Sequence, residues 1–261
     1  MDTLQAILLG IVQGITEFLP VSSSGHLQLA KELLGVELEN NITFDVTLHA
    51  ATVLSTIVVL WRELWQLLRG AFSKSFNDEQ RYILNVVVSM IPAGVVGVLF
   101  ADQIEALFSS LWFVGLMLLL TAALLTFAYY AKPRQRSEIT TRDAFIIGLA
   151  QAAATIPGLS RSGSTIATGL LLGCEKSKVA NFSFIMVIPV ILGKMLLDIL
   201  SGEMAAMSVE TGVLISGFVA AFVSGALACK FMIEIVKRGK LIWFALYCAV
   251  VGLVAIIGTL C

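Results

Sequence analysis

The chain has 261 residues, of which 58% are hydrophobic and only 13% are charged, and its mean hydropathy is +0.92. Soluble domains are about a quarter charged. This composition therefore excludes a soluble globular protein, a disordered chain and a basic nucleic-acid-binding protein. The formal net charge of −1 also argues against capture of a polyanion. The sequence predicts an all-α integral membrane protein.

Six segments are predicted to cross the bilayer, which requires about 20 apolar residues. Four of them contain no charged residue and two contain charged residues. No removable signal peptide is expected, because the first residues carry no basic region and no cleavage site. The predicted spans are Phe44–Trp61, Tyr82–Ala101, Ala106–Ala131, Val179–Leu200, Thr211–Cys229 and Leu241–Cys261.

Two further apolar regions, residues 3–34 and 144–174, do not fit the pattern of a simple span. Glu17 and Pro20 interrupt the first, and Arg161 and Pro157-Gly158 interrupt the second. Irregular backbone at membrane depth is tolerated only where protein or a water-filled cavity surrounds it. Both regions are therefore predicted to be re-entrant helical hairpins.

The two hairpins match each other at a constant offset of 138 positions, which indicates an internal repeat. Gly10 and Gln13 fall on Gly148 and Gln151, and the run Ser22–Gly25 falls on Ser160–Gly163. The chain is accordingly divided into halves 1–138 and 139–261. Each half contains one re-entrant hairpin and three spans within a single membrane domain.

Charge placement predicts how the halves are oriented. The connections 62–81, 132–143, 175–178 and 230–240 hold 14 of the 17 basic residues. The positive-inside rule places these connections in the cytoplasm and both termini outside. Three spans per half is an odd number, so the halves have opposite orientations. The predicted fold is an inverted-topology repeat whose broken hairpins meet near the midplane.

The first hairpin carries a group of polar residues at its break. Gln13 and Glu17 lie four positions apart, on one face of a helix that Pro20 ends. Ser22 or Ser23 is expected to cap the next helix, Gly25 permits close approach, and His26 follows within one turn. A charge at midplane depth is costly, so Glu17 is a candidate functional residue.

The second hairpin supplies cationic and hydrogen-bonding groups. Ser160 is the expected N-cap, with Arg161 and Ser162 in the first helical turn. Two helix N-termini, each with free N–H donors, together with the guanidinium of Arg161 suit a phosphate. Purely structural roles stay open: Glu17 and Arg161 as an ion pair joining the halves, His26 as a core residue, and the serines as caps.

The segments Gln13–His26 (QGITEFLPVSSSGH) and Pro157–Ile166 (PGLSRSGSTI) resemble the two signature motifs of the bacterial undecaprenyl-diphosphate phosphatase family, the bacitracin-resistance type. The resemblance implies removal of the terminal phosphate from undecaprenyl diphosphate, which recycles the lipid carrier for cell-wall synthesis. It also implies dependence on a divalent cation (Mg²⁺ or Ca²⁺), location in the bacterial cytoplasmic membrane and an active site that faces the periplasm.

The same resemblance assigns roles to individual residues. Glu17 matches the essential glutamate, Ser23 the proposed nucleophile, His26 the motif histidine and Arg161 the phosphate-binding arginine. Gln13 departs from the many members that have glutamate there, which puts two-carboxylate metal binding in doubt. Glu17 and Gln13 are the candidate cation ligands. The predicted phosphate-binding set is Ser22, Ser24, Gly25, Ser160, Arg161, Ser162, Gly163 and Thr165.

Two rival functions are considered. A transporter or flippase could bind a lipid phosphate or an anion at the same midplane site, because broken helices in inverted repeats are typical of transporters. Another large class of membrane phosphatases shares fragments of these motifs. Ala167 and Leu171, however, occupy the positions where that class needs His and Asp.

Two further pairs of polar residues lie four positions apart in predicted helices. Asp45 and His49 could form a second acid–base or cation site or simply a polar helix end, and Lys194 and Asp198 are expected to pair within a helix. Membrane lipids and the lipid substrate are the expected partners, and a homodimer stays open. Close helix packing is predicted at Gly94, Gly97, Gly217 and Gly225.

Overall fold

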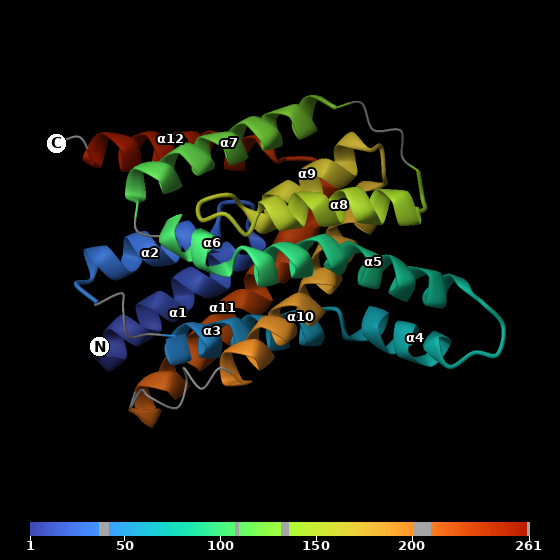
Figure 1. The fold of residues 1–261 in the computed structure, drawn as a ribbon, viewed down its shortest axis with the longest axis horizontal. Helices are drawn as coiled ribbons and strands as arrows, with labels where there is room; N and C mark the ends of the chain where they lie inside the picture. Colours follow the sequence, from blue (N-terminus) through green and yellow to red (C-terminus); the bar gives the residue numbers. More distant parts are fainter. Residues whose placement is uncertain (37–41, 108–109, 132–135, 201–209, 260–261) are drawn as a thin grey trace.

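The computed structural model of the chain describes residues 1–36, 42–107, 110–131, 136–200 and 210–259. These residues form twelve α-helices and contain no β-strand (Figure 1). The helices are α1 (Thr3–Phe18), α2 (Ser23–Leu33), α3 (Ile42–Val59), α4 (Trp61–Ala71), α5 (Asp78–Leu99), α6 (Ala101–Leu107), α7 (Leu111–Tyr130), α8 (Thr141–Ala153), α9 (Arg161–Leu171), α10 (Lys176–Leu200), α11 (Thr211–Arg238) and α12 (Ile242–Gly258).

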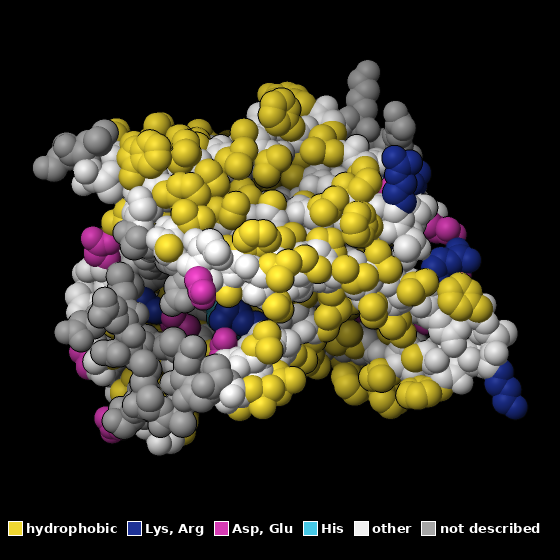
Figure 2. All heavy atoms as spheres, in the orientation of Figure 1, with side chains coloured by type: hydrophobic (Ala, Val, Ile, Leu, Met, Phe, Trp, Pro, Cys, Tyr) yellow, Lys and Arg dark blue, Asp and Glu magenta, His cyan; other side chains and the backbone are white. Residues whose placement is uncertain are grey.

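Four helices, α5, α7, α10 and α11, are long and apolar enough to cross a membrane. The pair α3 and α4 passes the same criterion only together, and α12 is apolar but has 17 residues. Figure 2 shows apolar side chains spread over α5, α7 and α12, with Lys and Arg side chains at the end of the molecule where the α4–α5 turn lies. The chain is therefore an all-α, multi-pass membrane protein.

All six predicted spans differ in their bounds from the helices of the structure; for example, α11 continues past the predicted end at Cys229 to Arg238, and two further differences have a clear local cause. The predicted span Phe44–Trp61 ends earlier, because α3 stops at Val59 and the chain bends by 79° into α4. The predicted span Ala106–Ala131 begins later, because the Ser110 hydroxyl accepts the N–H of Phe113 at 3.3 Å and starts α7 as its N-cap. A serine cap inside an otherwise apolar run separates two helices that hydropathy alone would merge. The C-terminal Cys261, with which the last predicted span ends, lies outside the described residues.

The two predicted hairpins are pairs of helices with a break between them. The first break runs from Leu19 to Ser22, and the second from Ala154 to Ser160. Helix α9 has the bounds of α2 shifted by the 138-residue offset. In Figure 1, α1 and α2 enter from the end of the molecule where α1 begins, and α8 and α9 enter from the opposite end.

In each hairpin, hydrogen bonds join the start of the first helix to the end of the second helix, and the bonds in the two hairpins correspond. Capping boxes begin both first helices: Asp2 with Gln5 for α1, and Thr140 with Asp143 for α8. Gln5 then donates to the carbonyl of Leu34 at 3.0 Å. In the second hairpin, Arg136 donates both to Asp143 and to the carbonyl of Leu172 (2.7 Å). Thr140, Asp143 and Leu172 lie at the 138-residue offset from Asp2, Gln5 and Leu34, so the offset is visible in the hydrogen bonding as well as in the sequence.

Helices of the two halves pack across each other in a reciprocal way. The first hairpin packs on the second half through α1 and α11, and the second hairpin packs on the first half through α8 and α5. Helices α7 and α12 cross at Gly115 and Gly252, where an added Cβ on either glycine would lie 2.8 Å from the other's carbonyl oxygen. Such small-residue crossings let backbones approach closely inside a membrane.

The four glycines expected at helix contacts divide into two pairs. A Cβ on Gly217 would lie 2.6 Å from the ring of Phe44, and one on Gly225 would lie 2.9 Å from Ser55 Oγ, so both are packing positions. The prediction was wrong for Gly94 and Gly97, around which no described heavy atom lies within 4 Å of an added Cβ. These two glycines lie on the side of α5 that no other described helix covers.

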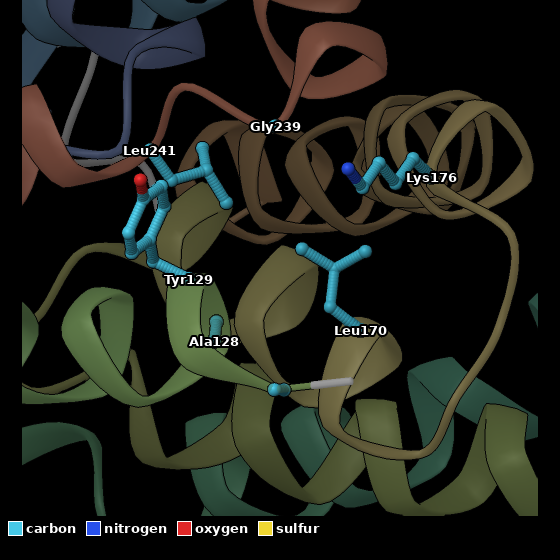
Figure 3. Close-up of a pocket in the computed structure, with 7 residues that line it drawn as sticks. Ala128, Tyr129, Leu170, Lys176, Gly239 and Leu241 are labelled. Atoms are coloured by element: carbon cyan, nitrogen blue, oxygen red, sulfur yellow. The ribbon is translucent and has the colours of Figure 1, made fainter. Parts of the chain in front are cut away.

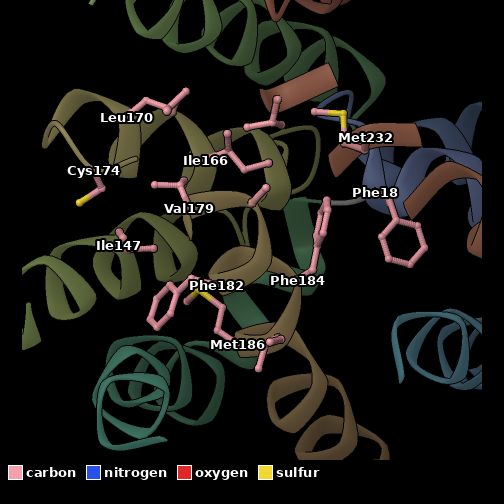
Figure 4. Packing of buried hydrophobic residues seen from close by; sticks show 14 of the residues in the cluster. Phe18, Ile147, Ile166, Leu170, Cys174, Val179, Phe182, Phe184, Met186 and Met232 are labelled. Atoms are coloured by element: carbon pink, nitrogen blue, oxygen red, sulfur yellow. The ribbon is translucent and has the colours of Figure 1, made fainter. Parts of the chain in front are cut away.

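The main hydrophobic core lies beside the hairpin breaks (Figure 4). Phe18, at the end of α1, meets Phe184 of α10 edge-on, with ring centroids 5.5 Å apart and planes at 80°. Such an aromatic pair contributes about 0.5–1.5 kcal/mol beyond its buried area. Because Phe18 follows Glu17, this contact fixes the end of α1 from which the Glu17 carboxylate projects.

Candidate functional site

The first hairpin places Glu17 and Ser23 on either side of a short break. Pro20 cannot continue α1, since it lacks an N–H and restricts the residue before it. Helix α2 starts after Ser22, whose hydroxyl accepts the N–H of Gly25 at 3.4 Å. Ser22 adopts φ +70°, the only positive φ among the described residues other than glycine. A strained residue of this kind persists only where its surroundings hold it, and such residues cluster at functional sites.

The second hairpin places Arg161 at the first position of α9. The Ser160 hydroxyl caps this helix by accepting the N–H of Gly163 at 3.0 Å, and the N–H of Ser160 donates to Thr121 Oγ1 at 3.0 Å. Gly158 takes φ +87°, a conformation that glycine adopts readily, and lies against the backbone of Val114. The break therefore fixes the start of α9, and with it the direction of Arg161.

The two breaks meet at Glu17. Arg161 Nη2 lies 2.5 Å from Glu17 Oε1, while Ser23 Oγ and Gln13 Nε2 donate to Glu17 Oε2 at 2.8 and 2.9 Å. The Glu17 side chain is only 6% exposed and that of Arg161 16%. A buried charge is tolerated when it is paired and hydrogen-bonded. The structure thus brings together four of the predicted site residues, Glu17, Ser23, Arg161 and Gln13.

Ser23 has the geometry of a nucleophile beside a base. Its hydroxyl donates to the Glu17 carboxylate, so the oxygen lone pairs point away from Glu17. Hydroxyl nucleophiles are activated by an adjacent general base within about 2.6–3.2 Å, and the guanidinium of Arg161 on the same carboxylate supplies the positive charge that phosphoryl groups need. The arrangement is chemically suited to phosphoryl transfer to a serine hydroxyl.

His26 lies outside the hydrogen-bonded group around Glu17. Its Nδ1 lies 2.8 Å from the carbonyl oxygen of Ser22, and its Nε2 lies 2.8 Å from the hydroxyl of Tyr247. The two rings are nearly parallel, at 17°, with centroids 5.5 Å apart. Within the described part of the chain, His26 makes no hydrogen bond with Glu17 or Arg161. Because a carbonyl can only accept, Nδ1 carries a proton, and in the neutral ring the Tyr247 hydroxyl donates to Nε2.

Tyr247 is the residue of this site that the sequence analysis missed. It lies on α12, 221 positions from His26, in a segment whose only sequence signal is hydrophobicity. The side chain is 44% exposed, and the neighbouring Cys248 anchors α12 to the first break by donating to the carbonyl of Pro20. No motif spacing could have connected it with His26.

The hydroxyls predicted to bind phosphate are engaged with the protein. Ser22 Oγ lies 3.3 Å from Ser24 Oγ, and Ser160 Oγ lies 3.4 Å from Ser162 Oγ. Ser162 also donates to the carbonyl of Leu19 at 3.0 Å, which ties the second hairpin to the first. Thr165 donates to the carbonyl of Arg161 and contacts Ser183. These bonds position the breaks, and Gly25 and Gly163 are the N–H donors that the two caps use.

The groups around Glu17 offer few ligands for a divalent cation. Among the described residues there is no group of three or more His, Cys, Asp and Glu side chains that could hold a metal ion. One oxygen nevertheless lacks a partner there: Gln13 Oε1 is buried without a hydrogen bond to any described group. Mg²⁺ often binds through one or two protein oxygens plus substrate phosphates. Glu17 and Gln13 Oε1 fit that mode, but not a cage built by protein alone.

Asp45 and His49 do not form a joint site. Asp45 accepts from the buried Lys31 at 2.6 Å, whereas His49 Nδ1 lies 3.1 Å from Gln13 Nε2. The expected pair of Lys194 and Asp198 is confirmed at 2.9 Å. His49 therefore belongs to the Glu17 cluster, and Asp45 to an ion pair between α2 and α3.

A small cavity of about 70 Å³ lies at the far end of α7 (Figure 3). Tyr129, Leu170, Lys176 and Leu241 line it, and it shares no residue with the Glu17 cluster. Its size would admit a water molecule or two but not a prenyl diphosphate. The cavity is therefore not the substrate site.

Comparison with known proteins agrees with the motifs. A family model described as bacitracin resistance protein BacA matches residues 6–254. Among relatives, the undecaprenyl-diphosphatase of Bacteroides fragilis is 60% identical over 261 residues, covering 98% of each chain, and that of Parabacteroides distasonis is 59% identical over 264 residues, covering 100% of this chain and 99% of the relative. The undecaprenyl-diphosphatase of Methanosphaera stadtmanae is 38% identical over 278 residues, covering 98% of each. The chain belongs to the BacA bacitracin-resistance family.

Proposed function

We propose that this protein hydrolyses undecaprenyl diphosphate to undecaprenyl phosphate and inorganic phosphate, and so recycles the lipid carrier for cell-wall synthesis. Relatives named undecaprenyl-diphosphatase match the whole chain at 59–60% identity. The single observation that carries the proposal is the contact of Ser23 and Arg161 with the same carboxylate, Glu17. That contact unites a nucleophile, a base and a phosphate-binding cation.

In the proposed reaction, the terminal phosphate of the substrate lies against Arg161 and the start of α2. The Ser23 hydroxyl attacks the terminal phosphorus while its proton passes to Glu17. The bond from that phosphorus to the bridging oxygen breaks, and undecaprenyl phosphate leaves with the bond's electrons. Water then cleaves the phosphoserine, which releases inorganic phosphate and returns a proton to Ser23. Positioning and charge stabilisation supply most of the catalysis in such transfers.

His26 and Tyr247 lie beside this centre, on the side of α12. The neutral His26 ring offers only a lone pair at Nε2, which the Tyr247 hydroxyl occupies. We assign the pair to the diphosphate group rather than to the Ser23 proton. The Tyr247 hydroxyl holds the ring of His26, and the ring orients the phosphates or, after Nε2 has taken up a proton from solvent in place of the bond to Tyr247, donates that proton to the leaving oxygen. The exposed side of Tyr247 and the apolar surface of α12 suit the prenyl chain.

A divalent cation, Mg²⁺ or Ca²⁺, is part of the proposal. Glu17 and the unpartnered Oε1 of Gln13 would be its protein ligands, with the remaining ligands supplied by the diphosphate. When bound, the cation would neutralise charge on the phosphate oxygens. The roles of Ser23, Glu17 and Arg161 described above do not depend on it.

The proposed location is the bacterial cytoplasmic membrane, with the active site open to the periplasm or exterior and both termini on that side. Six helices, α3, α5, α7, α10, α11 and α12, would cross the membrane, and the α1–α2 and α8–α9 hairpins would be re-entrant in an inverted repeat. The opposite entry of the two hairpins in Figure 1 and the 14 basic residues of the connections support this arrangement.

The direct test is phosphate release from undecaprenyl diphosphate by the purified protein in detergent. No gradient exists there, so a transporter or flippase would release none, whereas a phosphatase turns over. Ser216→Ala is a suitable control, because the Ser216 hydroxyl bonds to the carbonyl of Val213 in its own helix and to no other group of the described residues. Absence of phosphate release by the wild-type protein, with and without Mg²⁺ or Ca²⁺, would refute the proposal.

A further inference from the structure

Gln13 lies between the catalytic carboxylate and a second histidine. The side chain is fully buried, and its Nε2 lies 2.9 Å from Glu17 Oε2 and 3.1 Å from Nδ1 of His49. His49 comes from α3, 36 positions further along the chain, and its side chain is 34% exposed. An amide –NH₂ has two hydrogens, so it can satisfy both neighbours at once.

The chemistry of the neighbours fixes the orientation of this amide. Glu17 is ion-paired with Arg161 and is therefore an ionised carboxylate that can only accept. If Gln13 turned over, its Oε1 would take the place of Nε2 beside Glu17 Oε2, with two acceptors in contact. The –NH₂ must therefore face Glu17, and the same nitrogen then faces His49. Nδ1 of His49 accepts, and the neutral ring carries its proton on Nε2.

We propose that His49 is a positioning residue of the phosphatase reaction. By accepting from Gln13, its imidazole holds the amide so that the second hydrogen donates to Glu17 Oε2, the same oxygen to which Ser23 donates. It also leaves Gln13 Oε1 without a hydrogen-bond partner among the described residues. The inference rests on the roles proposed above for Glu17 and Ser23. His49 acts through Gln13 and does not contact the reacting phosphate.

A purely electrostatic role for His49 fits the distances less well. Its Nδ1 lies 3.8 Å from Glu17 Oε2, which is too far for a hydrogen bond. The distance from the same Nδ1 to Gln13 Nε2 is 3.1 Å, which is within hydrogen-bonding range. Asp45, one turn earlier on α3, is bound to Lys31, so it does not compete for the imidazole. Within the described residues, Gln13 is the one hydrogen-bond partner of the His49 ring.

The first experiment compares His49→Leu, which removes the acceptor, with His49→Gln, whose Oε1 can accept from Gln13. A loss of positioning at a reacting group costs about 10²-fold in rate. We expect kcat of His49→Leu to fall by about that factor with little change in KM, and His49→Gln to recover most of it. Thr47→Val, which removes a hydroxyl bonded to the carbonyl of Thr43 on the same helix, is the control. Equal losses in His49→Leu and His49→Gln would contradict the proposal.

A double-mutant cycle separates action through Gln13 from direct action. Once Gln13→Met has removed the amide, His49→Leu should cause no further loss of kcat. Additive losses would mean that His49 acts independently, and would overturn the inference. All variants are compared with thermal melting in detergent, so that unfolding is not mistaken for loss of catalysis.

A spectroscopic test does not depend on activity. The chain has two histidines, and the structure assigns them opposite tautomers: Nδ1–H for His26 and Nε2–H for His49. With ¹⁵N-labelled histidine at alkaline pH, one ring of each tautomer is expected, and the Nε2–H set should vanish in His49→Gln. Finding His49 as the Nδ1–H form would refute the proposed contact. If the protein released no phosphate but this pattern held, the proposed function would fail while the geometry stood.

Discussion

Arg161 and Glu17 lie 144 positions apart in the chain, yet Nη2 of Arg161 is 2.5 Å from Oε1 of Glu17. One residue begins α9 and the other lies in the last turn of α1, so this ion pair joins the breaks of the two hairpins. Both side chains are largely buried. The pair therefore has a structural and a chemical role, and the two can be separated by experiment.

Arg161→Met is expected to abolish phosphate release and to destabilise the protein. Loss of a phosphate-stabilising arginine lowers kcat by about 10³-fold or more. Leaving Glu17 buried without its partner costs about 3–5 kcal/mol of folding free energy. Arg161→Lys keeps the charge but not the planar fork, and should remain severely impaired. Rates are measured as phosphate released in detergent, and stability as the melting temperature of the same samples.

The double variant Glu17→Gln with Arg161→Met is the control for folding. It removes both charges, so its melting temperature should lie above that of Arg161→Met alone, while activity stays lost. Near-normal phosphate release by Arg161→Ala or Glu17→Ala protein would count decisively against the site. A double variant no more stable than the single one would mean that the ion pair has no structural role.

Ser23→Ala tests the nucleophile. Ser23 donates to Glu17 at 2.8 Å, so its removal should lower kcat by several orders of magnitude, as for other hydroxyl nucleophiles. With substrate labelled in the terminal phosphate, acid quenching during turnover should leave label on the peptide that contains Ser23. Ser216→Ala should label normally. Robust turnover by Ser23→Ala would instead assign the attack to a water molecule activated by Glu17.

Local signals in the sequence were enough to predict the hairpins and the meeting of their ends. Pro20 and Pro157-Gly158 interrupt apolar runs, and Ser22 and Ser160 are helix-capping residues, so the breaks and the caps were predicted correctly. The approach of Arg161 to Glu17 followed from the repeat and the charge distribution. The two residues carry opposite charges in matching apolar segments, and a buried charge without a partner is strongly destabilising.

Contacts made by spans could not be predicted in the same way. Tyr247 reaches His26 from α12, and His49 reaches Gln13 from α3, and in both cases the partner is set by how helices cross. Hydropathy reports only that a segment is apolar, and gives neither its rotation nor its neighbours. The same reason explains the wrong prediction for Gly94, which matches a packing glycine in type but lies on an uncovered side of α5.

Tyr247→Phe should reduce activity moderately. The change removes the hydroxyl that occupies Nε2 of His26 and leaves the ring in place. A hydrogen bond of about 0.5–1.5 kcal/mol corresponds to roughly a 2- to 10-fold fall in kcat. The ¹⁵N signal of His26 Nε2 should shift in the same variant. Tyr130→Phe, at the opposite end of α7 from the site, is the control, and an unchanged His26 signal in Tyr247→Phe would show that the contact is absent in solution.

The proposed topology can be checked with epitope tags. The first residue of α1 and the last turn of α12 lie at one end of the molecule, whereas α8 begins at the other end (Figure 1). A tag inserted at Glu138, an exposed residue before α8, should be protected from added protease in spheroplasts. Tags at the two termini should be cleaved. If the tag at Glu138 and the C-terminal tag were equally accessible, the six-span arrangement would be wrong.

The ion pair of Asp143 and Arg136, at the start of α8, should make the stability of the fold depend on pH in the acid range. Asp143 lies in the first turn of α8, directly before the apolar region 144–174, and accepts two hydrogen bonds from Arg136, at 3.0 and 3.1 Å, and others from Thr140. Burial alone would raise the pKa of Asp143, but these bonds and the charge of Arg136 hold it below its ordinary value. Folding therefore favours the ionised carboxylate.

This shift determines the sign of the pH effect. The stabilisation is complete above the ordinary carboxyl pKa of about 4 and is lost as the pH falls through the lower pKa of the folded state. At neutral pH, Asp143→Asn should melt about 2–5 °C below the wild type, since hydrogen bonds to a charged group contribute about 1.5–3 kcal/mol. The difference in melting temperature between Asp143→Asn and the wild type should become progressively smaller below the ordinary carboxyl pKa of about 4. Glu138→Gln is the control, because the exposed Arg81–Glu138 pair at 3.7 Å should matter little. A gap that stayed constant from neutral to acid pH would show that Asp143 is not held ionised by Arg136.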